Sequence, residues 1–185
     1  MHAPKILVAY YSRTGCTRTV AERLQRELNC DLEEIIDLRP RTGPIGYVRS
    51  GLEALLRRIP NIVEPRKSPA DYDLVVVATP EWAGTLSSPA RSYLTRNRDR
   101  FHRLAFVVTH ASPSPGRALE EMGHVAGTPP VAMLDLDDWR VQRNDVQPEI
   151  AQFARQISAV LDRLPPEQLP LRPVIPPEPV HPQHA

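Results

Sequence analysis

The sequence predicts an α/β fold, in which a parallel β-sheet carries helices on both faces. The first observation is that five short apolar runs alternate with segments of helical periodicity along the 185 residues. The second is that one run, residues 74–78, is apolar at every position, as is typical of a parallel strand covered on both faces. Strands that alternate with helices in this way favour a parallel sheet in a three-layer arrangement.

The individual elements follow from local patterns. A strand is expected at residues 5–11, and the helix after it, at about 17–28, carries Val20, Leu24 and Leu28 along one face. Residues 32–38 indicate an edge strand, because acidic side chains interrupt the apolar ones. Further strands are expected at 74–78, 104–109 and 131–136, and further helices at 47–59, 89–98, 115–125 and 148–164.

A loop rich in hydroxyl groups joins the first strand to the first helix. Its residues are Ser12, Arg13, Thr14, Gly15, Cys16 and Thr17. The hydroxyl groups are hydrogen-bond donors, and Gly15 lets the backbone approach a ligand closely. Because the N–H groups and the dipole of a helix start favour negative charge, this loop suits a phosphate. A plain turn capped by Thr14 or Thr17 explains the same residues equally well.

The loop also argues against several classes of phosphate-binding protein. It lacks the G-x-x-x-x-G-K-[ST] pattern of nucleotide triphosphatases and the G-x-G-x-x-G pattern of dinucleotide sites. A small phosphatase needs a cysteine nucleophile within the turn and an arginine at a fixed spacing after it, whereas Cys16 lies at the far end of the turn. A response regulator needs an aspartate where the third strand ends in Thr79 and Pro80.

A second loop follows the strand at residues 74–78. After Thr79 it contains Pro80, Glu81, Trp82, Ala83, Gly84 and Thr85. A tryptophan in such a loop is costly to expose and supplies a flat stacking surface, although a tryptophan that caps the edge of the sheet is the alternative. Ser88 and Pro89 then suit the N-cap and the first residue of a helix.

The two segments together resemble the flavodoxin family. The matching stretches are KILVAYYSRTGCT at residues 5–17 and YDLVVVATPEWAGT at 72–85, within a resemblance that covers about 5–164. The resemblance implies a flavodoxin-like three-layer sandwich with a five-stranded parallel sheet in the order 2-1-3-4-5. It also implies FMN, with its phosphate in the first loop and its isoalloxazine ring against the second. The peptides around Ala83 and Gly84 would then face the flavin N5.

By its position in such a fold, the end of the fourth strand forms a third loop of the cofactor site. Its residues are Thr109, His110, Ala111 and Ser112. Flavodoxins often carry an acidic or aromatic residue here, and this chain has neither. His110 is the candidate catalytic residue, because an imidazole that titrates near neutral pH can relay a proton to a reduced flavin or a quinone. A histidine that only makes structural hydrogen bonds is the alternative.

Composition and charge bound the location and the partners. The formal net charge is +1, so long-range attraction to a basic redox partner is weak. No segment resembles a signal peptide or a membrane span, and Cys16 and Cys30 suggest neither a metal site nor a disulfide framework. These features predict a cytoplasmic protein with reduced thiols and no nucleic-acid partner.

The chain is expected to form one domain at residues 1–164 and a proline-rich tail at 165–185 that is extended or disordered. The tail is a non-binding segment, a ligand for a partner domain or a strap over a neighbouring subunit. The long connection at 39–71 contains the helix expected at 47–59, which packs as an ordinary crossover helix or forms a lid, where Tyr47 could reach a flavin.

The leading functional hypothesis is an FMN-binding oxidoreductase that transfers electrons. It is either a carrier for a redox partner protein or an NAD(P)H-dependent reductase of a small quinone-like acceptor, and a homodimer is compatible with both. The alternative is a binding module on the same fold without redox turnover, since a fold does not fix a function.

Overall fold

The computed structural model describes residues 4–38, 43–111 and 117–163. A parallel sheet of five strands runs through its centre in the order β2-β1-β3-β5-β6. The strands are β1 (Ile6–Tyr10), β2 (Asp31–Glu34), β3 (Leu74–Trp82), β5 (Leu104–His110) and β6 (Ala132–Asp137). Counted along the chain, this is the order 2-1-3-4-5, so the predicted topology is confirmed. The predicted tail at 165–185 lies outside the described residues, and the domain boundary stays a prediction.

A sixth strand, β4 (Thr85–Leu86), pairs antiparallel with the end of β3. The sequence predicted only a loop between residues 79 and 88, and that prediction was wrong in part. β3 continues to Trp82 because its last residues find hydrogen-bonding partners beyond the parallel sheet: Glu81 lies opposite Leu86, and Trp82 lies opposite Thr85. The second loop is therefore a hairpin.

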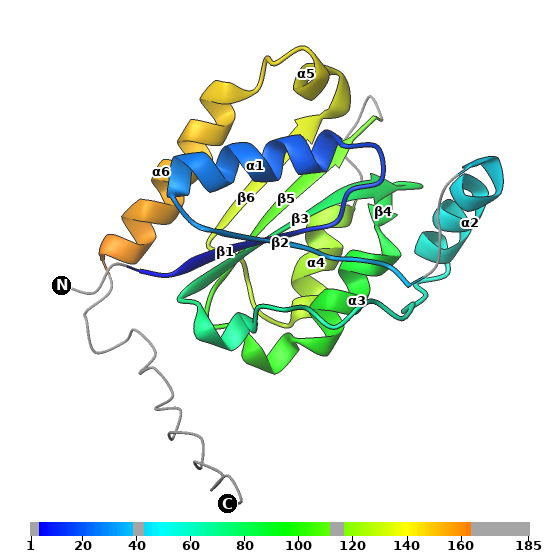
Figure 1. Cartoon of the computed structure of the whole chain (residues 1–185), viewed down its shortest axis with the longest axis horizontal. Helices are drawn as coiled ribbons and strands as arrows, with labels where there is room; N and C mark the ends of the chain where they lie inside the picture. The colour runs from blue at the N-terminus through cyan, green and yellow to red at the C-terminus, as the bar shows by residue number, and fades with distance from the viewer. Residues whose placement is uncertain (1–3, 39–42, 112–116, 164–185) are drawn as a thin grey trace, which may run out of the picture.

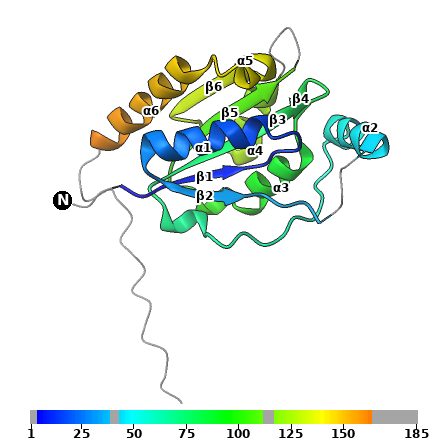
Figure 2. The same cartoon turned by 45° about the horizontal axis from the view of Figure 1, so that its top comes forward.

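Helices cover both faces of the sheet, as predicted (Figures 1 and 2). One face carries α1 (Cys16–Leu28), α5 (Asp138–Gln142) and α6 (Gln147–Asp162), and the other carries α3 (Ser88–Arg96) and α4 (Ala118–Ala126). The short helix α5 was not expected from the sequence. Single 3₁₀ turns at Pro69–Asp71 and Arg98–Arg100 precede β3 and β5. Each face of the sheet therefore buries a separate apolar core.

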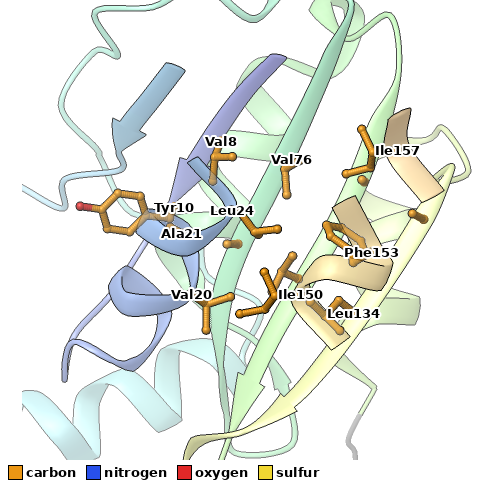
Figure 3. Close-up of a cluster of buried hydrophobic side chains, with 14 of the residues drawn as sticks. Val8, Tyr10, Val20, Ala21, Leu24, Val76, Leu134, Ile150, Phe153 and Ile157 are labelled. Carbon is orange, nitrogen blue, oxygen red and sulfur yellow. The ribbon is translucent and has the colours of Figure 1, made fainter. Parts of the chain in front are cut away.

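The core beneath α1 and α6 fixes where α1 begins. Val8 of β1 and Val76 of β3 point into it, and both are fully buried (Figure 3). The two helices contribute Val20, Leu24, Ile150, Phe153 and Ile157. Burying each such side chain stabilises the fold by about 1.5–3 kcal/mol. The apolar face of α1 thus docks on the sheet with the start of the helix at the carboxyl edge of β1.

That edge is a topological switch point. From β1 the chain continues to β2 on one side, and from β3 it continues to β5 on the other. β1 and β3 are neighbours, with Tyr10 opposite Ala78, and the Tyr11 N–H donates to the Ala78 carbonyl over 2.9 Å. Doubly wound sheets bind ligands outside the carboxyl ends of their strands at such a point.

The helix α2 (Gly43–Leu55) stands apart from the sheet, beside the β3–β4 hairpin (Figure 1). A helix was expected at 47–59; it begins earlier, and it ends before the positive φ of 53° at Arg57. Its small residues Gly46, Ser50 and Ala54 are buried. The large apolar side chains expected to pack inward are exposed: Val48, Leu52, Leu55, Leu56 and Ile59. α2 is therefore not an ordinary crossover helix over the core.

Two smaller features complete the fold. Ser88 was expected as an N-cap but is the first residue of α3, and Ser87 precedes it without a capping bond from its side chain. Pro89 lies in the first turn, as expected. Among the described residues, no helix is both long and apolar enough to cross a membrane.

Candidate functional site

The first loop leaves the start of α1 open to an acceptor. Gly15 is the N-cap of α1 with a φ of 98°, a left-handed conformation that glycine adopts without strain. Its N–H donates to Ser12 Oγ over 3.1 Å, which closes the loop on itself. Within the described part of the chain, no side chain caps α1, and its first turn contains no acidic residue. The first N–H groups of α1 therefore lack intrahelical partners and point at the space before the helix.

A hydroxyl pair joins the first loop to the third. Thr17 Oγ1 and Thr109 Oγ1 lie 2.9 Å apart, and both residues are almost completely buried. Thr17 is in the first turn of α1, and Thr109 is near the end of β5, so the pair spans the carboxyl edge of the sheet. The hydroxyl of the pair that turns its proton toward a ligand accepts the hydrogen bond that the other one donates.

An aromatic pair joins the first loop to the second. The rings of Tyr11 and Trp82 have centroids 5.4 Å apart and planes inclined by 88°, an edge-to-face contact. Both residues are 7% exposed. Trp82 thus packs into the core beside the loop, in agreement with the alternative that it caps the sheet edge, and its role as a flavin-stacking surface stays a prediction.

The turn of the second loop has two residues. Ala83 and Gly84 link β3 to β4 with φ angles of 50° and 74°, as a two-residue hairpin turn of the primed type requires. Both are exposed. The Gly84 carbonyl accepts the Arg117 N–H over 3.0 Å, which ties the turn to the start of α4. The Thr85 hydroxyl donates to Glu121, so it is committed to α4 and not to the first loop.

The third loop brings carboxylates to the site. His110 Nε2 lies 3.4 Å from Asp135 Oδ1, and the His110 side chain is 11% exposed. Asp138, the first residue of α5, is hydrogen-bonded to the side chains of Thr109 and Cys16. Burial raises the pKa of both Asp135 and Asp138, and the nearby His110 partly opposes this. Ser112 lies outside the described residues.

Comparison with solved structures identifies the fold. A flavoprotein of Lactobacillus acidophilus NCFM, solved in complex with FMN, is 23% identical over 76% of this chain and 98% of its own, with a TM-score of 0.63. A protein of Bacteroides uniformis ATCC 8492 named as a flavoprotein is 19% identical over 83% of this chain and 99% of its own, with a TM-score of 0.68. Oxidised Flavodoxin 2 of Bacillus cereus is 17% identical over 84% of this chain and 99% of its own, with a TM-score of 0.54. The fold is flavodoxin-like.

No protein-family model matches the chain, and a search of curated protein sequences gives no match either. The three structural identities are below 25%, so this comparison establishes the fold and leaves the ligand to be argued from the site residues.

In this flavodoxin-like fold, the residues predicted for a phosphate lie around one helix start. Cys16 and Thr17 form the first turn of α1, and Gly15 and Ser12 shape the approach to it. Thr14 is exposed and Arg13 is partly buried. Hydroxyl groups and unpaired N–H groups at a helix start fit the oxygens of a phosphate, so the residues present suit this part of FMN.

Two residues fit that site less well. Arg18 pairs with Glu34 of β2 over 2.6 Å and bonds to the Tyr10 hydroxyl, so it is directed to the edge strand. Asp138 was missed from the sequence, and one of its carboxylate oxygens is buried without a hydrogen-bond partner among the described residues. A carboxylate here opposes a phosphate unless it is protonated. The acidic residues at the end of the fifth parallel strand were the sequence feature from which a carboxylate at this site could have been predicted.

The residues predicted for the isoalloxazine ring are spread around the hairpin. Pro80 and Glu81 are half-buried, and Ala83 and Gly84 form the exposed turn. Ala111 is exposed at the end of β5. The structure thus places the first and third loops on either side of the end of β3, which continues into the second loop.

Proposed function

We propose that this protein binds FMN at the carboxyl edge of its sheet and transfers electrons through it. The observation that carries the proposal is the contact between Thr17 and Thr109, which brings the first and third loops together at an uncapped helix start. A flavodoxin-like structure with FMN bound, from Lactobacillus acidophilus, supports the choice of ligand. The position of the ring follows from the resemblance to flavodoxins, in which FMN lies at this switch point.

The phosphate contacts suffice energetically for useful affinity. A hydrogen bond to a charged group contributes about 1.5–3 kcal/mol, and we propose that the helix start and the loop hydroxyls together donate about four or five. Their sum is comparable to the association cost of roughly 4–15 kcal/mol, and the buried ring adds to it. No lysine or arginine is needed to hold the phosphate.

When bound, FMN supplies the redox chemistry, and the protein positions the ring and controls its surroundings. The residues of the β3–β4 turn present backbone groups to the ring edge, since Ala83 and Gly84 carry no bulky side chain. His110, held 3.4 Å from Asp135 at the end of β5, is the candidate proton relay in this proposal. Its role as a catalytic residue is part of this proposal.

Binding is tested by titrating the purified protein with FMN and, in parallel, with riboflavin, which lacks the phosphate. We expect a yellow protein with flavin absorption bands and an FMN dissociation constant at least tenfold below that of riboflavin. A colourless protein that FMN does not reconstitute contradicts the proposal. Equal affinity for the two flavins contradicts the proposed binding of the phosphate by the first loop.

The electron donor and acceptor belong to the proposal as well. Reduction of quinone-like acceptors with NAD(P)H is the turnover we propose, and a redox partner protein is the other acceptor. A redox titration separates them, because single-electron steps favour a carrier and a direct two-electron step favours a reductase. A cytoplasmic location and a homodimer complete the proposal.

A binding module without redox turnover is the second candidate. The packing of Trp82 into the core favours it, because a buried indole offers no face for ring stacking. This candidate predicts no reduction of ferricyanide or quinones by NAD(P)H in the presence of added FMN. Measured turnover above that of free FMN rules it out.

A further inference from the structure

A cavity of about 580 Å³ opens behind the β3–β4 turn. Ala83, Gly84 and Thr85 of the hairpin form one wall, the end of α2 forms the second, and α4 forms the third. The volume lies within the range of about 300–1,000 Å³ that small-molecule sites occupy. It is separate from the helix start of α1, since no residue of the first loop lines it.

The lining of this cavity is cationic. Arg57, Arg91 and Arg117 face two glutamates, Glu120 and Glu121, together with His124. Glu120 lies 3.7 Å from His124, and both side chains are largely exposed. Glu121 is thus the only carboxylate that pairs with an arginine of the lining, as far as the described residues extend.

Glu121 already has four partners among the described residues. It pairs with Arg91 over 2.9 Å and with Arg57 over 3.1 Å, and it accepts from the Leu86 N–H over 3.0 Å. Burial raises the pKa of this carboxyl group, but the hydrogen bonds from Arg91, Thr85 and Leu86 outweigh burial and lower it. The carboxylate is therefore ionised near neutral pH, and its Oε2 atom already contacts Arg91, Thr85 and Leu86.

Arg117 is left as the unpaired cation. Its side chain is exposed at the cavity wall, and it makes no ion pair with any acid in the described ranges. Arg57 contacts Glu121 through Nε, and its terminal nitrogens have no acceptor in that part of the chain. Two guanidinium groups thus line the same cavity, and guanidinium groups bind carboxylates well.

The buried member of the set shows that the site is built rather than incidental. The Arg91 side chain is 5% exposed, and its Nε atom is buried without a hydrogen-bond partner among the described residues. A buried guanidinium is costly unless its charge and donors are met. An anion in the cavity would supply negative charge beside it. Leu55 and Val125 add apolar surface for the body of a ligand.

We propose that this cavity binds a small organic anion, an aromatic or unsaturated carboxylate, with the carboxylate against Arg117 and Arg57 and the apolar body between Leu55 and Val125. Binding itself does not depend on a flavin. If the proposed FMN site is correct, on which this further step rests, the ligand lies across the Ala83–Gly84 turn from the ring.

The test uses isothermal titration calorimetry with 2-naphthoate as the probe and neutral 2-naphthamide as its uncharged counterpart. We expect 2-naphthoate to bind the purified protein at least tenfold more tightly than the amide. Arg117→Gln should weaken 2-naphthoate at least fivefold, and Arg57→Gln should weaken it as well. Arg58→Gln is the matched control, because Arg58 is the exposed neighbour of Arg57 and does not line the cavity.

Three outcomes overturn the proposal: no binding of 2-naphthoate, equal binding of acid and amide, or the same affinity in Arg117→Gln as in Arg58→Gln. Thermal unfolding of each variant confirms that the fold is retained. The absorption spectrum of the same samples reports the flavin independently. A colourless protein that binds 2-naphthoate refutes the FMN site alone, and a yellow protein that does not bind it refutes the anion site alone.

Discussion

The hydroxyl oxygens of Thr17 and Thr109 lie 2.9 Å apart, although the two residues are separated by 92 positions in the chain. The contact exists because β1 and β5 both flank β3, so their carboxyl ends meet at one edge of the sheet. It makes Thr17 the residue through which the first loop and the third loop are most directly linked.

Thr17→Ala should weaken FMN binding by about 1–2 kcal/mol, because one hydrogen bond to the phosphate is lost. The dissociation constant, measured from the quenching of flavin fluorescence, should rise roughly 5- to 30-fold. Thr17→Ser keeps the hydroxyl and should restore most of the affinity. Thr95→Ala, at an exposed threonine of α3, is the control. An unchanged constant in Thr17→Ala removes this residue from the site.

Asp138→Asn should tighten FMN binding, by about fivefold at pH 7, or about 1 kcal/mol. The Asp138 carboxylate, bonded to Thr109 and Cys16, opposes the phosphate charge, and the amide does not. Burial raises the pKa of Asp138. As the pH falls, Asp138 therefore becomes protonated at a higher pH than an ordinary aspartate, whose pKa is about 3.9. The ratio of the two dissociation constants should therefore approach one as the pH falls.

Comparison of the variant with the wild type cancels the titration of the FMN phosphate itself, since both proteins bind the same ligand. Asp162→Asn, at an exposed aspartate at the end of α6, should leave the affinity unchanged at every pH. A weaker affinity in Asp138→Asn means that the carboxylate positions the loop and does not repel the ligand.

Glu121→Gln should lower the free energy of unfolding at pH 7 by about 1–3 kcal/mol, since buried hydrogen bonds to a charge are lost. The folded pKa of Glu121 is below its unfolded value. Its contribution is thus complete above the ordinary glutamate pKa of about 4.3 and disappears as the pH falls through the folded pKa. Urea unfolding at several pH values should show the difference between variant and wild type shrinking on acidification.

Glu120→Gln is the matched control for that measurement, because this neighbouring side chain is 69% exposed and is 3.7 Å from His124. It should change the free energy of unfolding by less than about 0.5 kcal/mol. A difference for Glu121→Gln that stays constant down to pH 3 contradicts the lowered pKa.

Gly84→Ala should destabilise the fold by about 1 kcal/mol, because φ at this position is 74° and a Cβ disfavours it. No atom of the described chain lies within 4 Å of the Cβ that would be added, so the cost is in the backbone alone. Gly123→Ala, inside α4 with equally open space, should instead stabilise by about 0.4–1 kcal/mol. Thermal unfolding should shift in opposite directions, and equal shifts would contradict the turn geometry.

The strands were predictable from the sequence pattern, and their order in the sheet from the resemblance to flavodoxins. Apolar runs located the strands, and the hydroxyl residues and glycines after them located the loops, since the ends of parallel strands share one edge. Thr17 and Thr109 were both expected there, and the structure brings them into contact.

Three features were not predictable, each for its own reason. The hairpin turn uses Ala83 at a positive φ, without the Asn-Gly or Asp-Gly pair that usually indicates such a turn. Periodicity gave α2 an apolar face, but a pattern does not say which face meets the protein, and Gly46, Ser50 and Ala54 pack inward. Asp138 is one of several acidic residues around the end of β6, and the sequence did not predict α5, which buries its side chain in part.

The bond from the Arg117 N–H to the Gly84 carbonyl has a consequence for energy coupling. Any rotation of the peptide that follows Gly84 breaks this bond and releases the first residue before α4. Binding of a ligand at Arg117 and reduction of the flavin on the other side of the turn would therefore be coupled. The coupling free energy would be the same in both directions. Occupancy behind the hairpin would then shift the midpoint potential, and reduction would shift the occupancy by the same factor.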